Sequence, residues 1–82
     1  MKERINVKIE YDYSKLIGRI IEKFGSQKKF APAVRLSERS LSLKLNGLVP
    51  FKQPEIDKSA ELLSIPEKEI GLYFFTRKVQ NF

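Results

Sequence analysis

The sequence has no cysteine, no histidine and no tryptophan among its 82 residues. Without cysteine, the chain has no disulfide bridge, no thiolate nucleophile and no cysteine-ligated zinc or iron–sulfur site. Without histidine, it lacks the side chain most often used as a general base near neutral pH and the commonest metal ligand. We therefore expect a protein that is not an enzyme and that carries neither a metal ion nor another cofactor.

Long hydrophobic runs are also absent. No apolar stretch approaches the roughly 20 residues that a membrane-spanning helix needs, and the opening residues, Met1-Lys-Glu-Arg, lack the apolar stretch of a signal peptide. The hydrophobic share of 41%, with three tyrosines and six phenylalanines, is nevertheless sufficient for a folded core. These features predict one cytoplasmic domain over residues 1–82, with no membrane partner and no small-molecule ligand.

Positive charge dominates the sequence and is unevenly distributed. The net charge is +6, yet residues 13–53 carry nine basic side chains against two acidic ones, a local excess of +7. The following segment, residues 54–75, has an excess of three acidic side chains. A basic half beside an acidic half indicates one face that meets a polyanion such as nucleic acid. The alternative is an ordinary solubilising surface.

The apolar pattern predicts a short strand and then a helix. Ile5, Val7, Ile9 and Tyr11 alternate with polar residues, which is typical of a strand over about 5–11. The following apolar residues recur at helical spacing and predict a helix over 13–24, with Gly25 at its end and Asp12 or Ser14 as its N-cap: Leu16, Ile17, Ile20, Ile21 and Phe24.

Two more helices are predicted close together. Ser26 is a good N-cap for a helix over 27–34, which Pro32 should make either kinked, or short and partly 3₁₀. Ser37 is the predicted N-cap of a third helix over 38–45, and Asn46-Gly47 ends it.

Prolines mark the last two predicted helices. Pro54 suits the first helical position of a fourth helix, whose inward residues are Ile56, Ala60 and Leu63. Pro66 repeats this device for a fifth helix, in which Ile70, Tyr73 and Phe74 are apolar. Residues 75–82 are expected to form a strand or a loose tail.

A short helix, a turn of about three residues and a second helix over 27–46 have the geometry of a helix-turn-helix. The run Gln27-Lys-Lys-Phe-Ala-Pro-Ala-Val-Arg-Leu-Ser-Glu-Arg-Ser-Leu-Ser-Leu-Lys-Leu-Asn-Gly47 resembles the Cro/repressor-type, or lambda-repressor-like, helix-turn-helix family. Small regulators of bacteriophages and prophages are similar over residues 13–75. The resemblance implies a mainly α, compact five-helix DNA-binding domain, with peripheral segments at 1–12 and 75–82.

Two positions depart from this family pattern. Arg35 stands in the turn where the family usually has glycine, so we expect a positive φ there at a cost of about 1 kcal/mol. Lys44 stands at a usually apolar position of the second helix, with Leu45 beside it to take over the packing. Both departures bear on the angle between the two helices.

The resemblance implies that helix 38–45 enters the major groove of DNA. Its base-reading positions are Glu38, Arg39, Ser42 and Leu43. Arg39 can bond guanine, Glu38 can accept from cytosine, and Leu43 can contact a thymine methyl group. The residues expected to hold phosphates are Gln27, Lys28, Lys29, Lys44, Asn46 and Lys52.

Each of these roles has an alternative. Arg39 is also consistent with a solvated helix residue or a surface partner of Glu38, and Glu38 with a charge that stabilises the helix N-terminus. Leu43 suits the core as well as the groove. Lys28 and Lys29 suit an ordinary solvated surface.

Together, these features predict a sequence-specific transcriptional regulator that binds double-stranded DNA, of the phage Cro-like repressor type. Because single helix-turn-helix modules bind weakly, we expect a homodimer on a palindromic operator, with half-sites about one helical turn apart. The strand at 5–11, the segment 73–82, or both would make the dimer contacts. The alternative is a protein-interaction module, such as an antirepressor or adaptor, that keeps this fold without binding DNA.

Overall fold

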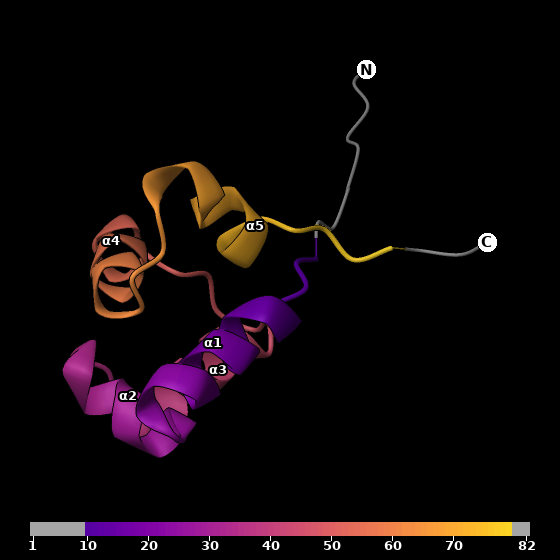
Figure 1. Cartoon of the computed structure of the whole chain (residues 1–82). Coiled ribbons are helices and arrows are strands. Elements are labelled where there is room, and N and C mark those ends of the chain that lie inside the picture. The colour runs from indigo at the N-terminus through magenta and orange to yellow at the C-terminus, as the bar shows by residue number, and fades with distance from the viewer. Residues whose placement is uncertain (1–9, 80–82) are drawn as a thin grey trace.

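The computed structural model describes residues 10–79 and folds into a mainly helical domain (Figure 1). This confirms the predicted fold class, with five α-helices in the described residues. Their bounds are α1 Ser14–Phe24, α2 Gln27–Ala33, α3 Glu38–Leu45, α4 Gln53–Leu62 and α5 Ile70–Phe74, with a 3₁₀ turn, η1 Glu67–Glu69, directly before α5.

The terminal segments meet beside α5. Residues 1–9 lie outside the described residues, and with them most of the strand predicted at 5–11. Within 10–79 no strand forms; instead, Tyr11 and Arg77 make an isolated antiparallel bridge. Two backbone bonds flank it, from Asp12 N to Thr76 O at 2.7 Å and from Lys78 N to Glu10 O at 2.9 Å.

Serine side chains begin α2 and α3, as predicted. Ser26 Oγ accepts a hydrogen bond from Lys29 N at 3.1 Å, and Ser37 Oγ accepts one from Ser40 N at 3.0 Å. Each bond satisfies a backbone donor that has no partner within its helix. The bounds of α3 are those predicted from the sequence.

The start of α1 differs from the prediction. Its N-cap is Tyr13, which makes no side-chain cap bond. The Asp12 carboxylate instead accepts a hydrogen bond from Ser14 N at 2.8 Å. Asp12 thus caps the first backbone donor of α1 from the position before the N-cap. Gly25, with φ of 87°, ends the helix as predicted.

The turn after α2 is a Schellman motif without glycine. Leu36 N donates to Ala31 O at 2.9 Å and Arg35 N to Pro32 O at 3.1 Å, while Arg35 adopts φ of 62°. The positive φ expected for Arg35 is therefore confirmed. Although Pro32 lies inside α2, the helix is α-helical throughout its seven residues, short as predicted but not 3₁₀.

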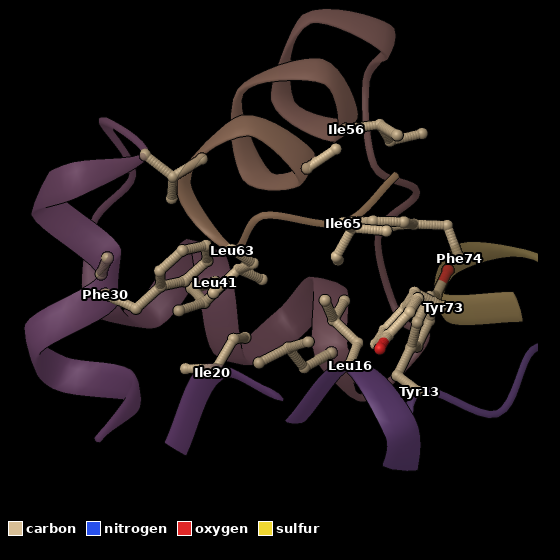
Figure 2. Close-up of a cluster of buried hydrophobic side chains, with 14 residues drawn as sticks. Tyr13, Leu16, Ile20, Phe30, Leu41, Ile56, Leu63, Ile65, Tyr73 and Phe74 are labelled. Atoms are coloured by element: carbon tan, nitrogen blue, oxygen red, sulfur yellow. The ribbon is translucent and has the colours of Figure 1, made fainter. Parts of the chain in front are cut away.

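One core cluster lies between the helices (Figure 2). Leu16 and Ile20 of α1 are fully buried, whereas Ile21, predicted on the same apolar face, is 46% exposed because it lies beside the line that Leu16 and Ile20 follow. The residues predicted to face inward from the fourth helix are all buried: Ile56, Ala60 and Leu63.

Two proline positions correct the prediction. Pro54 is the second rather than the first residue of α4, because Lys52 is the N-cap. Pro66 precedes the 3₁₀ turn η1, and regular α-helix begins only at Ile70. Tyr73 and Phe74 of α5 are buried as expected, and Ile70 is half-buried.

Candidate nucleic-acid interface

Helices α2 and α3 pack against each other through small and apolar side chains. Phe30 and Ala31 of α2 are each 1% exposed, and Leu41 of α3 is completely buried. The burial of Ala31 leaves no room for a larger side chain where the two helices meet. This contact fixes how α2 and α3 pack against each other. The first turn of each helix carries solvent-exposed residues.

The first turn of α3 presents the two charged candidates to solvent. Glu38 and Arg39 are both exposed, and among the described residues neither side chain forms a hydrogen bond or an ion pair. The surface pair between Glu38 and Arg39 that the sequence allowed does not form. Both side chains are free to contact a ligand.

The other two base-reading candidates are less accessible. Ser42 and Leu43 are half-buried, between the buried Leu41 and Leu45. Ser42 Oγ lies 3.3 Å from Asn46 Nδ2 as an acceptor and keeps its own hydroxyl proton to donate. Leu43 is half-buried but is not one of the side chains that pack against the core cluster, so part of it is accessible to a ligand.

The phosphate-contact candidates comprise residues that are accessible to a ligand and residues whose side chains are used within the fold. Lys28 and Lys29 are exposed on the first turn of α2, and the half-buried Gln27 is its first residue. Lys52 is exposed at the N-cap of α4. Asn46 is exposed but has a structural role, since its Nδ2 donates to Ser42 O at 2.9 Å and caps the end of α3.

The structure does not place Lys44 where it could contact a phosphate, contrary to the role expected from the sequence. The residue is 5% exposed, and its Nζ lies 3.0 Å from Pro50 O and 3.0 Å from Glu55 Oε1. Lys44 thus occupies the usually apolar position as a buried charge that is paired with a half-buried carboxylate. It connects α3 to the start of α4.

Glu55 is held in its charged form. Burial raises the pKa of this carboxyl, but the hydrogen bond from Lys52 N and the Lys44 ammonium outweigh it, so that the net pKa is lowered from 4.5. The bond from Lys52 N to Glu55 Oε1 is 2.9 Å long and also caps the first turn of α4. The sequence offered one indication of this pair, a lysine at an apolar position.

A second charged side chain in the basic segment also has a structural role. Arg19 of α1 donates from Nε to Leu63 O at 2.9 Å and from Nη2 to Ser64 O at 3.3 Å. These carbonyls belong to the end of α4, where Ser64 adopts φ of 55°. Arg19 and Lys44 therefore add no free positive charge to the surface. The exposed basic residues of α2 and α3 are Lys28, Lys29 and Arg39.

Within residues 10–79, no group of three or more acidic, histidine or cysteine side chains is placed to hold a metal ion. Over the same residues, every helix is too short or too polar to cross a bilayer.

The chain belongs to a family described as protein of unknown function (DUF739), which matches residues 9–77. Its fold is similar to the solution structure of the modulator of repression (MOR) of the temperate bacteriophage TP901-1 from Lactococcus lactis, with a TM-score of 0.72. The two chains are 49% identical, and the alignment covers 87% of this chain and 96% of that one. No curated protein matches the sequence.

Proposed function

We propose that this protein is a phage-type regulator of transcription that binds double-stranded DNA through α2 and α3, by binding alone and without catalysis. The observation that carries the proposal is the arrangement of α3: Leu41 is buried, while Glu38 and Arg39 on its first turn are exposed and without partners among the described residues. The N-terminal residues of a recognition helix are those that contact base edges in a helix-turn-helix.

Each exposed side chain has a defined chemistry on DNA. Arg39 can donate two hydrogen bonds to O6 and N7 of guanine, and Glu38 can accept from N4 of cytosine. Lys28 and Lys29 lie one helix away and supply positive charge for the phosphate backbone. Ser42 and the accessible part of Leu43 complete the face that α3 presents.

One domain of this size makes few contacts, so we propose a homodimer that binds a palindromic operator. In such an arrangement the two copies of α3 would enter successive major grooves about one helical turn apart.

The decisive experiment is selection of bound fragments from a random pool of duplex DNA, followed by a salt titration on the selected sequence. We expect a palindromic consensus and an affinity that falls with a log–log slope of about −0.9 for each phosphate contact. If the folded protein retards no DNA at low salt, the proposal is wrong.

A second candidate is a protein-interaction module within a repression system. Its support is the similarity to a phage modulator of repression, at 49% identity. In this case the exposed turn of α3 would contact another regulator rather than base edges. A folded protein without DNA binding would favour this candidate, particularly if Arg39→Ala abolished its effect on a phage repressor and Lys68→Ala, on the exposed η1 turn, did not.

A further inference from the structure

Helix α3 is attached to the core along a narrow line. The side chains that it contributes to the core cluster are Leu41 and Leu45, which lie one turn apart on the same face. Contacts along a single line restrain the tilt of a helix more than its rotation about its own axis. A contact to one side of this line is what fixes the rotation.

Lys44 supplies such a contact. At about 100° of rotation for each residue, it lies about 60° around the helix from Leu41, on the side away from Leu45. Its Nζ atom is 3.0 Å from Pro50 O and 3.0 Å from Glu55 Oε1, and both partners lie outside α3. Because hydrogen bonds weaken steeply with distance and angle, these two contacts resist a roll of α3 more sharply than an apolar side chain would.

The helix that carries Glu55 is itself held at both ends. At its start, Glu55 Oε1 also accepts a hydrogen bond from Lys52 N at 2.9 Å. At its end, Leu63 is completely buried, and Arg19 of α1 donates from Nε to Leu63 O at 2.9 Å. The Glu55 carboxylate is therefore a fixed point against which Lys44 sets the rotation of α3.

The rotation of α3 determines where its exposed first turn points. Arg39 lies about 140° around the helix from Lys44, so a roll that releases Lys44 turns Arg39 by the same angle. A side chain that ends about 5–6 Å from the helix axis moves about 2 Å when the helix rolls by about 20°. Two parallel hydrogen bonds to a guanine do not survive such a displacement, whereas a flexible lysine can follow a phosphate.

We infer that the Lys44–Glu55 pair sets the rotation of α3 and thereby the base preference of the protein, acting through Arg39. Both members are positioning residues, since neither contacts DNA in this arrangement. The inference rests on the proposed function and adds which buried side chains determine its specificity. The phosphate contacts expected from Lys28 and Lys29 are independent of the pair, because these side chains lie on α2.

Removing both charges of the pair together tests this role. The double variant Lys44→Met/Glu55→Gln keeps the side-chain volumes and the net charge of +6, and it leaves no buried ion without a partner. The matched control is Lys58→Met/Glu61→Gln, the same change at an exposed pair of α4 whose charged atoms lie 3.6 Å apart. Circular dichroism and urea denaturation establish that both variants are folded.

The measurement is the preference for the selected operator over a version changed at the base pair whose preference Arg39→Ala relaxes. The wild type and the control should show the discrimination of about 5- to 150-fold that one base pair provides. The Lys44→Met/Glu55→Gln protein should lose about fivefold or more of this preference, while its log–log salt slope stays unchanged. A loss of folded protein would weaken both sequences alike. A folded double variant with the full preference would overturn the inference.

A second readout tests whether the pair acts through Arg39. Arg39→Ala should weaken operator binding about fivefold or more in the wild type, but less than about twofold in the Lys44→Met/Glu55→Gln background. Equal effects in the two backgrounds would show that the pair does not position Arg39.

Lys44→Met alone decides the question if the double variant does not fold. It removes both contacts of the ammonium group, and its change in net charge affects both sequences equally and cancels in the preference. We expect the same direction of change, and a full preference would overturn the inference.

The wild-type protein separates this inference from the proposed function. If it prefers its operator and the folded variants keep that preference, the positioning role is wrong and the proposed function stands. If it retards no DNA at low salt, the proposed function is wrong and the positioning role falls with it.

Discussion

The Nζ atom of Lys44 lies 3.0 Å from Oε1 of Glu55, joining the last turn of α3 to the first turn of α4. Both side chains are withdrawn from solvent, with exposed fractions of 6% and 16%. The pair fixes which residues of α3 face inward, because Lys44 cannot leave the interior without exposing apolar neighbours and separating from its partner. Its presence leads to several tests.

Breaking the pair from its two sides should have unequal effects on stability. Glu55→Gln leaves the Lys44 ammonium buried beside Pro50 O alone, and we expect a loss of about 3 kcal/mol in the free energy of unfolding. Lys44→Met replaces the charge with an apolar chain of similar length, while Glu55 keeps its bond from Lys52 N, so the change should stay within about 1 kcal/mol. Urea denaturation measures both. Equal losses for the two variants would show that the charge of Lys44 is not buried as described.

The same pair predicts how stability depends on pH. The folded pKa of Glu55 lies below 4.5, so the folded protein binds fewer protons here than the unfolded chain. Its stabilising contribution is therefore complete above pH 4.5 and is lost as pH falls through the folded value. We expect the stability difference between the wild type and Glu55→Gln to shrink over this range. Asp12→Asn should show a separate pH dependence of the same sign that adds to that of Glu55→Gln, because hydrogen bonds from Ser14 lower the pKa of Asp12.

Arg39 and Lys28 should differ in their effect on sequence preference. Arg39→Ala should cost about 1–3 kcal/mol of binding and relax the preference at one base pair, whereas Lys28→Ala should weaken all sequences alike. Competition between the selected operator and its single-base variants measures this difference. Uniform weakening by both substitutions would show that Arg39 holds phosphate and does not read a base.

Lys44 provides a further test on DNA. Lys28→Ala should reduce the magnitude of the log–log salt slope by about 0.9, the value for one phosphate contact. Lys44→Met should leave the slope unchanged, since the ammonium group is buried and already paired. A smaller salt slope for a folded Lys44→Met variant would show that Lys44 contacts a phosphate after all, as the sequence suggested.

The left-handed residue of the turn between α2 and α3 should tolerate glycine. Arg35→Gly removes a backbone strain of about 1 kcal/mol, part of which is offset by the greater freedom of glycine in the unfolded chain. We expect the melting temperature to stay level or rise slightly. Ser64→Gly at the end of α4 is the matched control with φ of 55°, and should behave similarly. A clear loss of stability in Arg35→Gly alone would assign the Arg35 side chain a packing role.

The elements set by local chemistry were the most predictable from sequence. Ser26, Ser37 and Gly25 act on backbone groups within a few residues of themselves, so their positions predicted where α1 ends and where α2 and α3 begin. The positive φ of Arg35 was predictable from the resemblance, because Arg35 stands where the family usually has glycine. The five-helix order followed from these signals and from the resemblance to small phage regulators.

The features missed by the sequence depend on contacts between distant residues. Lys44 and Glu55 lie eleven positions apart, and only the fold shows that the lysine turns inward to meet the carboxylate. Arg19 was one of the nine basic side chains counted over residues 13–53, and only the structure places its guanidinium on the end of α4. The sequence also did not indicate that the hydrogen bond from Leu48 N to Leu43 O turns the chain after α3 and leaves the Leu48 side chain exposed.

The separation between the exposed first turn of α3 and its anchored second half has an evolutionary consequence. Glu38 and Arg39 take part in no ion pair within residues 10–79, whereas Leu41, Lys44 and Leu45 hold the helix in place. Single substitutions at positions 38 and 39 can therefore arise at little cost to folding, the largest being the loss of the Glu38 charge at the helix N-terminus. If α3 reads DNA as proposed, a lineage with this domain can change the sequence it recognises one residue at a time while its scaffold stays the same.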